Sequence, residues 1–328
     1  MRPYDAAALM PPPVTVAVVS WNTRELLGAC LESLAGDARE GLAEVHVVDN
    51  ASDDGSAAMV AARFPWARLT ASERNLGYGP AVNLVADGSR SPWLLAANAD
   101  TAPRAGALAA LLRCGESDRE VGIVAPRLVH GDGSTQHSVH PFPTLPFALA
   151  FNLGLAAVAP AWGRRRLLEG HWDPEQARTI DWALGAFLLI RRAAFDAAGG
   201  FDSEQWIYAE DLDLAWRAAA SGWRVRYEPS AVVRHAGGAA TSQAWGARAD
   251  VEAMRSTYAW MLRRRGATVT RAYGLVNTAG ALARLALATP GALADRGDAR
   301  ARWRALRRFS ALHGANLLAR RAVLARHR

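Results

Sequence analysis

Short apolar runs and helically spaced apolar residues alternate along the first third of the chain. Residues 14–19 read VTVAVV, which predicts a buried strand, and residues 24–35 carry leucines at the three-to-four-residue spacing of a helix. The succession repeats, with strands predicted at 45–48, 69–71 and 93–96 and helices near 56–64, 77–87 and 104–114. This alternation predicts an α/β fold with a mostly parallel central sheet and helices on both faces.

The second half of the chain departs from this alternation. Residues 126–180 are irregular, rich in histidine and proline, and contain three consecutive arginines at 164–166. Long loops inside compact domains are often functional. The remaining pattern predicts a strand at 182–190, a helix at 209–220, strands near 223–228 and 231–235, and basic helices from about residue 246.

We expect the chain to consist of three parts. Residues 1–12 would be a flexible leader, because their weak apolar stretch and proline run do not make a signal peptide. Residues 13–245 would form one α/β domain with two halves, 13–125 and 126–245. Residues 246–328 would form a basic helical extension.

The formal charge of +7 suggests a nucleic-acid partner until it is located along the chain. All 38 basic side chains are arginines, and from residue 251 onward 16 arginines accompany three acidic residues, so the rest of the chain is acidic overall. A nucleic-acid groove needs basic and aromatic residues interleaved, so we expect no nucleic-acid partner. Cys30 and Cys114 have no second thiol or histidine at metal-binding spacing, which favours small buried residues in a reducing, cytoplasmic setting.

Polar residues stand at the ends of the first four predicted strands. They are Ser20 with Asn22, Asp49 with Asn50, Arg74 with Asn75, and Asn98 with Asp100. Ligands of parallel sheets bind beyond the carboxyl ends of the strands. Each residue taken singly could be a turn or cap residue, but four strand ends in succession favour a binding site at one edge of the sheet.

Two common nucleotide signatures are absent from that edge. The turn after the first strand reads SWNT, with neither GxGxxG nor GK[ST], which disfavours a nicotinamide dehydrogenase and a P-loop kinase. Asp49 remains as a hydrogen-bond acceptor. Asp100, beside Asn98, could hold a divalent cation, because hard cations prefer oxygen ligands.

A pair of acids opens the helix predicted at 209–220. Glu210 and Asp211 precede an amphipathic run. Negative charge is favoured at a helix N-terminus, so helix capping is one interpretation. The other is that one of the two is a general base. We expect Asp213, farther along the helix, to be a surface residue.

Seven segments carry a family resemblance. In chain order they are VVSWNTRELLGACLESL, VVDNASDDGS, ERNLGYGPAVN, LLAANAD, DWALGAFLLIRR, GGFDSEQWIYAEDLDLAWR and PSAVVRHAGG. Through them the chain resembles family 2 glycosyltransferases of the GT-A fold, near the bacterial rhamnosyltransferase-like group, over roughly residues 14–240. The resemblance implies that residues 13–125 bind the nucleotide-sugar and that residues 126–245 bind the acceptor.

The resemblance also implies roles for the polar strand ends. Ser20 and Asn22 would line the nucleotide pocket, and Asp49 would accept a hydrogen bond from the imide N–H of uracil or thymine. A divalent cation, Mg²⁺ or Mn²⁺, would lie near Asp100 and His235. Further contacts with the nucleotide and donor sugar would come from Arg74, Asn75, Asn83 and Asn98.

The later segments imply the acceptor side of the site. Trp182 and Gly185 would form the edge shared by the acceptor and the donor sugar, with Glu210 beside them. Asp211 would be the catalytic base. An inverting transfer needs a carboxylate within reach of the acceptor hydroxyl and positive charge near the leaving diphosphate.

Two departures from the family pattern qualify these roles. The sequence NAD at 98–100 lacks the first acid of the Asp-x-Asp metal motif, and the Gln-x-x-Arg-Trp sequence of processive members is absent. The second absence favours the addition of one sugar or a few. For His235, a strand-end role satisfied by the backbone is the alternative. We expect His137, His140 and His171 on a surface loop, with acceptor contact as the alternative.

The sequence therefore predicts an inverting, non-processive glycosyltransferase. The expected donor is dTDP-L-rhamnose or a UDP-sugar, and the expected acceptor is a glycan or lipid-linked molecule of cell-wall, O-antigen or capsule-type polysaccharide synthesis. One alternative is a sugar-phosphate nucleotidyltransferase, which would want a glycine-rich basic first loop. The other is a basic nucleic-acid-binding protein, which the charge distribution disfavours.

The basic tail allows two arrangements. Residues 272–294 are apolar, yet Arg284 and Pro290 interrupt them, so we expect no membrane span. Apolar residues also recur at i, i+3 and i+6 among the arginines of residues 299–310, which suits a helix lying on the anionic inner face of the plasma membrane. The alternative is an arginine-covered helix packed on the catalytic domain.

Overall fold

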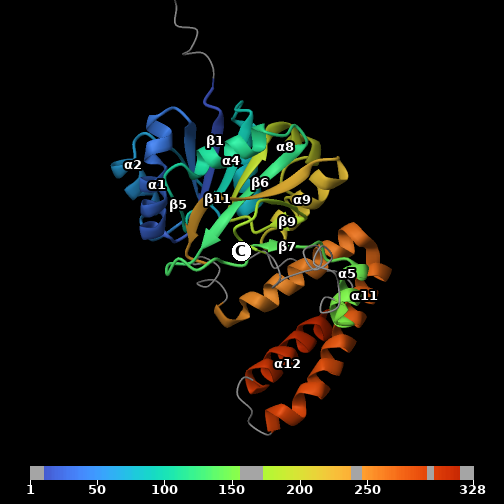
Figure 1. Cartoon of the computed structure of the whole chain (residues 1–328). Coiled ribbons are helices and arrows are strands. Elements are labelled where there is room, and N and C mark those ends of the chain that lie inside the picture. Colours follow the sequence, from blue (N-terminus) through green and yellow to red (C-terminus); the bar gives the residue numbers. More distant parts are fainter. Residues whose placement is uncertain (1–10, 156–172, 238–245, 294–298, 318–328) are drawn as a thin grey trace, which may run out of the picture. The chain divides into compact units, whose positions relative to one another are not determined.

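The computed structural model describes residues 11–155, 173–237, 246–293 and 299–317. The expected leader therefore lies almost entirely outside the described residues, and the arginine cluster at 164–166 and His171 lie outside them. Contacts divide the chain into two units, one of residues 1–140 and 173–246 and the other of residues 141–172 and 247–328 (Figure 1). This division differs from the expected boundary, because residues 141–172 group with the C-terminal extension.

The first unit is built on a sheet of nine strands among the described residues, in the order β3-β2-β1-β4-β10-β6-β11-β5, with β8 paired to β11. Strands β3, β2, β1 and β4 are parallel, and β10 runs antiparallel between β4 and β6, while β11 is parallel to β6. The expected α/β fold with a mostly parallel sheet is confirmed. The strands are β1 (Val14–Ser20), β2 (Ala43–Asp49), β3 (Arg68–Ala71), β4 (Trp93–Asn98), β5 (Thr101–Pro103), β6 (Val121–Val129), β8 (Arg178–Ile180), β10 (Phe187–Arg191) and β11 (Arg224–His235).

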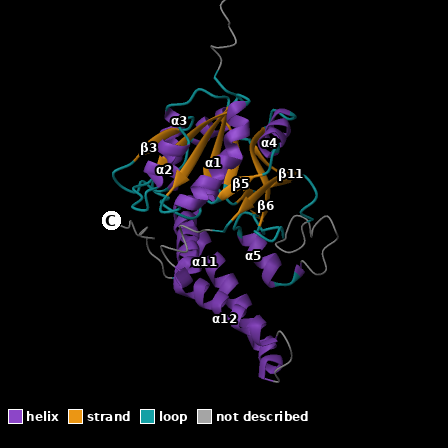
Figure 2. Ribbon diagram, turned by 90° about the vertical axis from the view of Figure 1, so that its left-hand side faces the viewer, coloured by secondary structure: helices purple, strands orange, loops and turns teal. Residues whose placement is uncertain are grey.

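Helices lie against both faces of this sheet (Figure 2). Val14, Val16 and Val18 of β1 belong to one apolar core with buried residues of α1, α2 and α4. Successive strand side chains point to opposite faces, and Thr15 accordingly bonds Ser89, just after α3, through its Oγ1 at 2.6 Å. The helices are α1 (Arg24–Arg39), α2 (Ser56–Arg63), α3 (Tyr78–Asp87), α4 (Ala107–Glu116), α8 (Arg192–Ala198) and α9 (Glu210–Ala220).

The strand predicted at 182–190 is two strands. β9 (Trp182–Ala183) pairs with β7 (Val139–His140) in a separate two-stranded ribbon, while β10 joins the central sheet. Gly185 lies in the break between β9 and β10. The continuous apolar sequence hides this break, because the residues before and after it are all apolar.

The structure also corrects the prediction in the second half of the sheet. The two strands expected near 223–228 and 231–235 are one strand, β11, whose pairing with β6 shifts register between Glu228 and Val232. Pro126 of β6 pairs at this shift, opposite Glu228, where a residue without an N–H is tolerated. Residues 126–129, expected to be irregular, therefore belong to β6, and β5 was not predicted.

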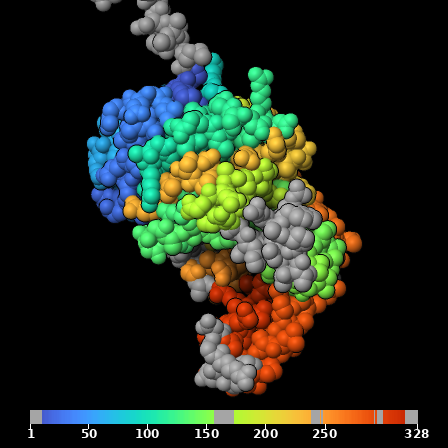
Figure 3. All heavy atoms as spheres, in the orientation of Figure 1, coloured from blue at the N-terminus to red at the C-terminus, as the bar shows by residue number. Residues whose placement is uncertain are grey.

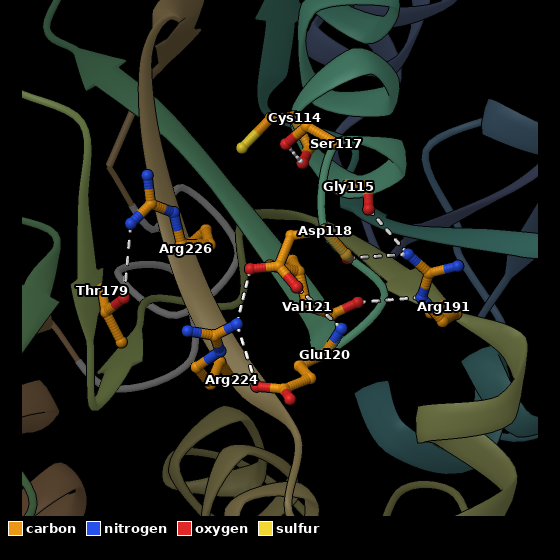
Figure 4. A network of polar contacts seen from close by, with 10 residues as sticks. All are labelled: Cys114, Gly115, Ser117, Asp118, Glu120, Val121, Thr179, Arg191, Arg224 and Arg226. Carbon is orange, nitrogen blue, oxygen red and sulfur yellow. Dashed lines mark hydrogen bonds and ion pairs between the residues drawn. The ribbon is translucent and has the colours of Figure 1, made fainter.

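Arginines tie together the edge of the sheet where β6 and β11 begin (Figure 4). Arg224 of β11 pairs with Asp118 at 2.5 Å and with Glu120 at 3.0 Å, just before β6. Arg191, at the end of β10, donates to the carbonyls of Val121 and Gly115 at 2.8 and 2.6 Å. This network belongs to the edge opposite the carboxyl ends of the parallel strands.

The second unit is helical. It contains α5 (Leu145–Asn152), α11 (Ala249–Leu293) and α12 (Ala299–Asn316). The short 3₁₀ helix η2 (Gly246–Arg248) lies directly before α11. Gly266 interrupts α11 with φ 77° and ψ 166°, a conformation open to glycine alone. A hydrogen bond of 2.7 Å between Tyr258 of α11 and His313 of α12 joins the two long helices. In the described ranges we find no helix with the length and apolarity to cross a bilayer.

Candidate active site

The carboxyl ends of the parallel strands bring four candidate residues to one edge of the sheet. Ser20, Asp49, Asn98 and His235 are the last residues of β1, β2, β4 and β11. Ser20 pairs with Asp49 in the register of β1 and β2, and Asn98 pairs with Val19 across β1 and β4. The convergence expected from the sequence is therefore present in the fold.

A buried carboxylate marks the β2 end of this edge. Asp49 is 3% exposed, and its Oδ2 accepts a hydrogen bond from the N–H of Ser52 at 3.1 Å. Its Oδ1 is buried without a hydrogen-bond partner among the described residues. A buried acceptor left unpaired costs about 1–3 kcal/mol, so this oxygen is suited to receive an N–H from a ligand.

The turn after β1 braces the loop that follows Asp49. Asn22 has a left-handed φ of 51°, which asparagine tolerates better than most residues. Its backbone N–H donates to Ser52 Oγ at 2.9 Å, and its side-chain oxygen accepts from the N–H of Asp53 at 2.9 Å. Ser20 is buried and its hydroxyl lies 3.0 Å from that of Thr23. These contacts hold both turns in a fixed relation.

The segment after β3 lies against the same loop. Asn50 accepts from the N–H of Leu76 and donates to the carbonyl of Gly77, both at 3.3 Å. Asn75 turns the segment by accepting from the N–H of Gly77 at 2.9 Å, and Arg74 is exposed. Asn75 thus shapes the loop, while the Arg74 side chain is accessible to a ligand.

Asn83 has a structural place that the sequence did not suggest. Its side-chain nitrogen donates to the carbonyl of Phe201 at 2.8 Å, and its oxygen accepts from the N–H of Phe201 at 2.9 Å. Both ends of the amide therefore hold the turn at residues 200–201 against α3. This use differs from the expected contact with nucleotide or donor sugar.

Asp100 and His235 lie close together, as two residues that share one cation would. Their side chains are buried, and Asp100 Oδ1 lies 3.4 Å from His235 Nε2. His235 Nδ1 donates to Gln136 Oε1 at 2.8 Å, which leaves the lone pair on Nε2, the form that binds metals. Nε2 has no hydrogen-bond partner among the described residues. Gln136 is a residue that the sequence analysis missed.

The protein supplies only part of the ligand set that a divalent cation needs. No group of three or more His, Cys, Asp or Glu side chains forms a metal site in the described part of the chain. A carboxylate oxygen and an imidazole nitrogen that carries a lone pair suit Mn²⁺ or Mg²⁺ when diphosphate oxygens and water complete the shell. Asn98, two residues before Asp100, stands where the family's first acid would be and is half-buried.

Strained backbone precedes the acid pair of α9. Tyr208 and Ala209 have φ values of 56° and 63°, and the other non-glycine residues with positive φ in the described chain are Asn22 and Ala51. Asn22 is itself a candidate site residue, and the other three lie within two positions of Asp49 or Glu210. Such strain costs about 1–3 kcal/mol per residue and persists where the surroundings enforce it. The turn at 208–209 leads directly into the first turn of α9, which carries Glu210 and Asp211.

The two acids of this pair have different surroundings. Asp211 Oδ2 accepts from the N–H of Gly185 at 2.8 Å, and Oδ1 accepts from the N–H of Leu212 at 2.7 Å. Glu210 Oε2 is buried without a hydrogen-bond partner among the described residues. Burial and the neighbouring Asp211 raise the pKa of Glu210 to about 8. Burial also raises the pKa of Asp211, but its two N–H donors favour the ionised form. At neutral pH the shared proton therefore belongs on Glu210.

Gly185 and Tyr78 connect the acid pair with the sheet edge. A Cβ at Gly185 would lie 3.2 Å from Asp211 Cβ, so a side chain there would crowd the carboxylate. Tyr78 donates from its hydroxyl to the carbonyl of Gly185 at 2.8 Å. Burial and the negative charges of Glu210, Asp211 and Asp100 raise the pKa of Tyr78. The pKa of Tyr78 thus depends on acids at both ends of the site. No signal in the sequence indicated Tyr78 as a site residue.

The β7–β9 ribbon adds an aromatic element. The ring of His140 stacks on Trp182 at 4.7 Å, and His137 meets His140 edge-on at 4.8 Å. A charge on His140 would lower the pKa of Asp211, which places His140 within electrostatic reach of the base candidate. The expectation of a plain surface loop is therefore wrong for His140, which is half-buried. The pairing of β7 with β9 spans a long loop, so periodicity could not show it.

Asp213 is a clear correction. It was expected at the surface but is fully buried, and it forms an ion pair with Arg217 at 2.7 Å. Arg217 also donates to the carbonyl of Ala198 in α8. The i, i+4 spacing of opposite charges was the available signal. Through Arg217, Asp213 fixes α9 against α8. Asp213 therefore has a structural role, and Asp211 remains the candidate base.

A family model described as glycosyltransferase-like family 2 matches residues 11–257. The chain belongs to this family of glycosyltransferases. One relative, the N-acetylglucosaminyl-diphospho-decaprenol L-rhamnosyltransferase of Mycobacterium tuberculosis, is 33% identical over 236 residues, covering 67% of this chain and 75% of the relative. The rhamnosyltransferase WbbL of Escherichia coli K12 is 39% identical over 51 residues, 16% of this chain and 19% of the relative. The expected resemblance to bacterial rhamnosyltransferases is confirmed.

A solved glycosyltransferase structure shares the fold. The mannosyltransferase PcManGT of Pyrobaculum calidifontis, in complex with GDP-Man and Mn²⁺, superimposes with a TM-score of 0.57 at 20% identity. The match covers 95% of this chain and 88% of that chain. The GT-A-type architecture expected for this glycosyltransferase is thereby confirmed.

Proposed function

We propose that this glycosyltransferase moves one sugar, with inversion, from a nucleotide-sugar to a lipid-linked acceptor. One observation carries the proposal. Among the described residues, three buried polar atoms lack a hydrogen bond at the candidate site: Asp49 Oδ1 and His235 Nε2, at the ends of β2 and β11, and Glu210 Oε2, at the start of α9. Unpaired buried polar atoms are rare in folded proteins and need a partner. A nucleotide, a cation and a sugar hydroxyl are partners of matching chemistry.

The donor side would begin at Asp49. Its free oxygen can accept the imide N–H of uracil or thymine, and the exposed Arg74 can reach phosphate oxygens. We favour dTDP-L-rhamnose, with UDP-sugars as the second choice. The similarity to the mycobacterial rhamnosyltransferase supports this order.

Asp100 and His235 would hold a divalent cation together with the donor diphosphate. Bound there, Mg²⁺ or Mn²⁺ would stabilise negative charge on the leaving nucleoside diphosphate. His235 would present Nε2 because Gln136 accepts the proton of Nδ1. The Mn²⁺ of the structurally similar mannosyltransferase supports this choice of ion.

Asp211 would take the proton of the acceptor hydroxyl as that oxygen attacks the anomeric carbon. The N–H groups of Gly185 and Leu212 orient its carboxylate, while burial makes it a stronger base than an exposed aspartate. Glu210, protonated at neutral pH, would donate a hydrogen bond to a sugar hydroxyl. A positioned base of this kind contributes about 10²–10⁴ in rate.

The acceptor would enter beside the β7–β9 ribbon. The Trp182 and His140 rings offer a flat surface against which the apolar face of a sugar can stack. The name of the mycobacterial relative describes an acceptor of N-acetylglucosamine on a diphospho-decaprenol. An acceptor of that chemistry, a sugar linked through diphosphate to a polyprenol, is the one we propose for this chain.

A donor panel tests the proposal. The purified chain is incubated with UDP-, dTDP- and GDP-sugars, with and without Mn²⁺, in the presence of a polyprenol-diphosphate-linked N-acetylglucosamine. We expect nucleoside diphosphate release with one dTDP- or UDP-sugar, dependent on acceptor and on cation. Lack of binding and turnover with every donor would remove the proposal, and pyrophosphate release from a nucleoside triphosphate and a sugar phosphate would favour a nucleotidyltransferase.

A further inference from the structure

The second unit exposes apolar residues where a soluble helix exposes polar ones. Within residues 272–293 of α11, every residue with a described, exposed side chain is apolar. Leu275 and Leu282 are 61% and 51% exposed. An exposed helix face of a soluble protein is ordinarily polar. The exposed set comprises Leu275, Ala279, Leu282, Ala283, Ala286, Leu287, Pro290 and Leu293.

The polar residues of the same stretch face the interior of the unit. Asn277 is buried and accepts from Asn152 of α5 at 2.9 Å. Arg284, the one charged residue between 272 and 293, donates to Asn152 at 2.8 Å and lies over the Phe151 ring at 4.7 Å. The polar side chains of this stretch are therefore covered while its exposed side chains are apolar, which is the arrangement expected where the outer surroundings are apolar.

α5 lies on the side of α11 that carries Asn277 and Arg284, and it exposes apolar residues of its own. It packs on α11 (Figure 1), and its exposed residues, with those just after it, are Pro146, Leu149, Leu153, Gly154 and Leu155. The sequence carries no charged residue from 141 to 163. Among the described residues of the whole chain, eight of the ten exposed large apolar side chains belong to this unit. Large exposed apolar patches mark interaction sites.

Positive charge accompanies this surface. Residues 141–172 and 247–328 hold 20 arginines and five acidic residues. Five exposed arginines lie on α12, which packs along α11, and Figure 3 shows these two helices at the surface of the second unit. They are Arg300, Arg302, Arg304, Arg307 and Arg308.

The apolar side of α12 is not available for docking. Trp303, Leu306 and Phe309 are half-buried, and Trp303 Nε1 donates to Thr289 of α11 at 3.1 Å. The helix expected to lie on a membrane through these three residues instead packs on α11. The exposed apolar residues of α11 are the better candidates for that role.

We propose that the leucine surface of α11, made of Leu275, Leu282, Leu287 and Leu293, docks on an anionic lipid bilayer. The leucines enter the boundary between head groups and acyl chains, and the arginines of α12 contact lipid phosphates. Docking rests on the proposed function in one respect, because a polyprenol-linked acceptor is presented at such a surface. The binding itself needs neither donor nor acceptor.

Vesicle sedimentation tests the proposal. The full chain is mixed with vesicles of phosphatidylglycerol and phosphatidylcholine, without any sugar nucleotide or acceptor. Burying a leucine gives about 1.5–3 kcal/mol, so the double variant Leu275→Asp/Leu282→Asp should bind more than about 100-fold more weakly. The control is Leu84→Asp in α3 of the first unit, where the leucine is 46% exposed, and it should bind like the wild type.

The arginines are tested in the same assay. Arg302→Gln/Arg304→Gln should weaken binding to anionic vesicles about 30-fold, at about 1 kcal/mol for each charge. It should not change binding to pure phosphatidylcholine. Circular dichroism and urea unfolding check that each variant is folded.

Three results would overturn the proposal. They are equal vesicle binding by the leucine variant, equal losses in the Leu84→Asp control, and a wild-type dimer that the leucine variant converts to a monomer while neither binds vesicles. The last result would assign the surface to a second copy of the chain. Since no transfer is measured, failure of the donor panel would leave the docking result standing, and failure of docking would leave transfer to a detergent-solubilised acceptor intact.

Discussion

The acid pair of α9 makes a prediction that needs no knowledge of donor or acceptor. Glu210→Gln keeps the shape and the hydrogen-bonding capacity of a protonated glutamic acid but cannot ionise. The pKa of Glu210 rises from 4.5 to about 8 on folding, because of burial and of Asp211 beside it. An acid whose folded pKa is raised contributes stability that is present below its unfolded pKa and is lost as the pH rises through its folded pKa.

The expected size follows from these two values. Each pKa unit corresponds to about 1.4 kcal/mol. Integrated between pH 5 and pH 9, ionisation of Glu210 should cost the wild type about 4 kcal/mol of unfolding free energy that Glu210→Gln does not lose. The two proteins should have similar stability near pH 5, and the variant should be the more stable at pH 9.

Urea unfolding at pH 5, 7 and 9, followed by far-UV circular dichroism, measures this difference. Glu204→Gln, which changes an exposed carboxylate a few residues before the same helix, is the matched control and should follow the wild type at every pH. A stability difference between wild type and Glu210→Gln that stays constant from pH 5 to pH 9 would refute the reasoning. In that case either Asp211 would hold the proton in place of Glu210, or both acids would be ionised.

Three further predictions concern nucleotide binding, the loop after β3 and the second unit. Asp49→Asn should weaken nucleoside diphosphate binding about 10- to 100-fold in calorimetry, the equivalent of one charged hydrogen bond, and unchanged affinity would contradict the assignment. Gly77→Ala should cost about 1–3 kcal/mol in urea beyond the effect of Gly133→Ala. The two glycines have φ values of 85° and 84°, but only at Gly77 would a Cβ meet Trp206, at 2.6 Å; equal losses would count against that contact. Burial lowers the pKa of His313 from 6.5 to about 4, so stability present above pH 6.5 should fall by about 3 kcal/mol as the pH drops to 4, and His313→Gln, measured by urea unfolding, should not show this fall.

Much of the nucleotide half was predictable from the sequence because its signals are local. The β-branched run before Ser20 and the polar residues at the end of each strand predict both the parallel sheet and its binding edge. Chain order then brings Asp49 and Asn98 beside β1, as the observed register has it.

The remainder depends on contacts between distant segments. The family resemblance assigned Asn83 to the ligand. Its bond with Phe201 could not be seen in the sequence, because it joins residues 118 positions apart. Tyr78 was missed, and His140 was expected on a surface loop, because the bond to Gly185 and the β7–β9 pairing cross long stretches of chain. Asp213 was expected at the surface because the sequence analysis gave no weight to its ion pair with Arg217, four residues along the helix. Periodicity reports which face is apolar, and it does not report which distant segment covers that face.

Asp211→Asn tests the central claim most directly. Asparagine keeps one acceptor for the N–H groups of Gly185 and Leu212, at a stability cost of about 1–3 kcal/mol, but it cannot take a proton. With the nucleotide-sugar that turns over in the donor panel, we predict that kcat falls about 10²–10⁴-fold while donor affinity measured by calorimetry stays unchanged. Asp213→Asn is the control, expected to lower stability by breaking the pair with Arg217 while leaving kcat per folded molecule unchanged. Retained turnover in Asp211→Asn, or loss of turnover and donor binding together, would contradict the account.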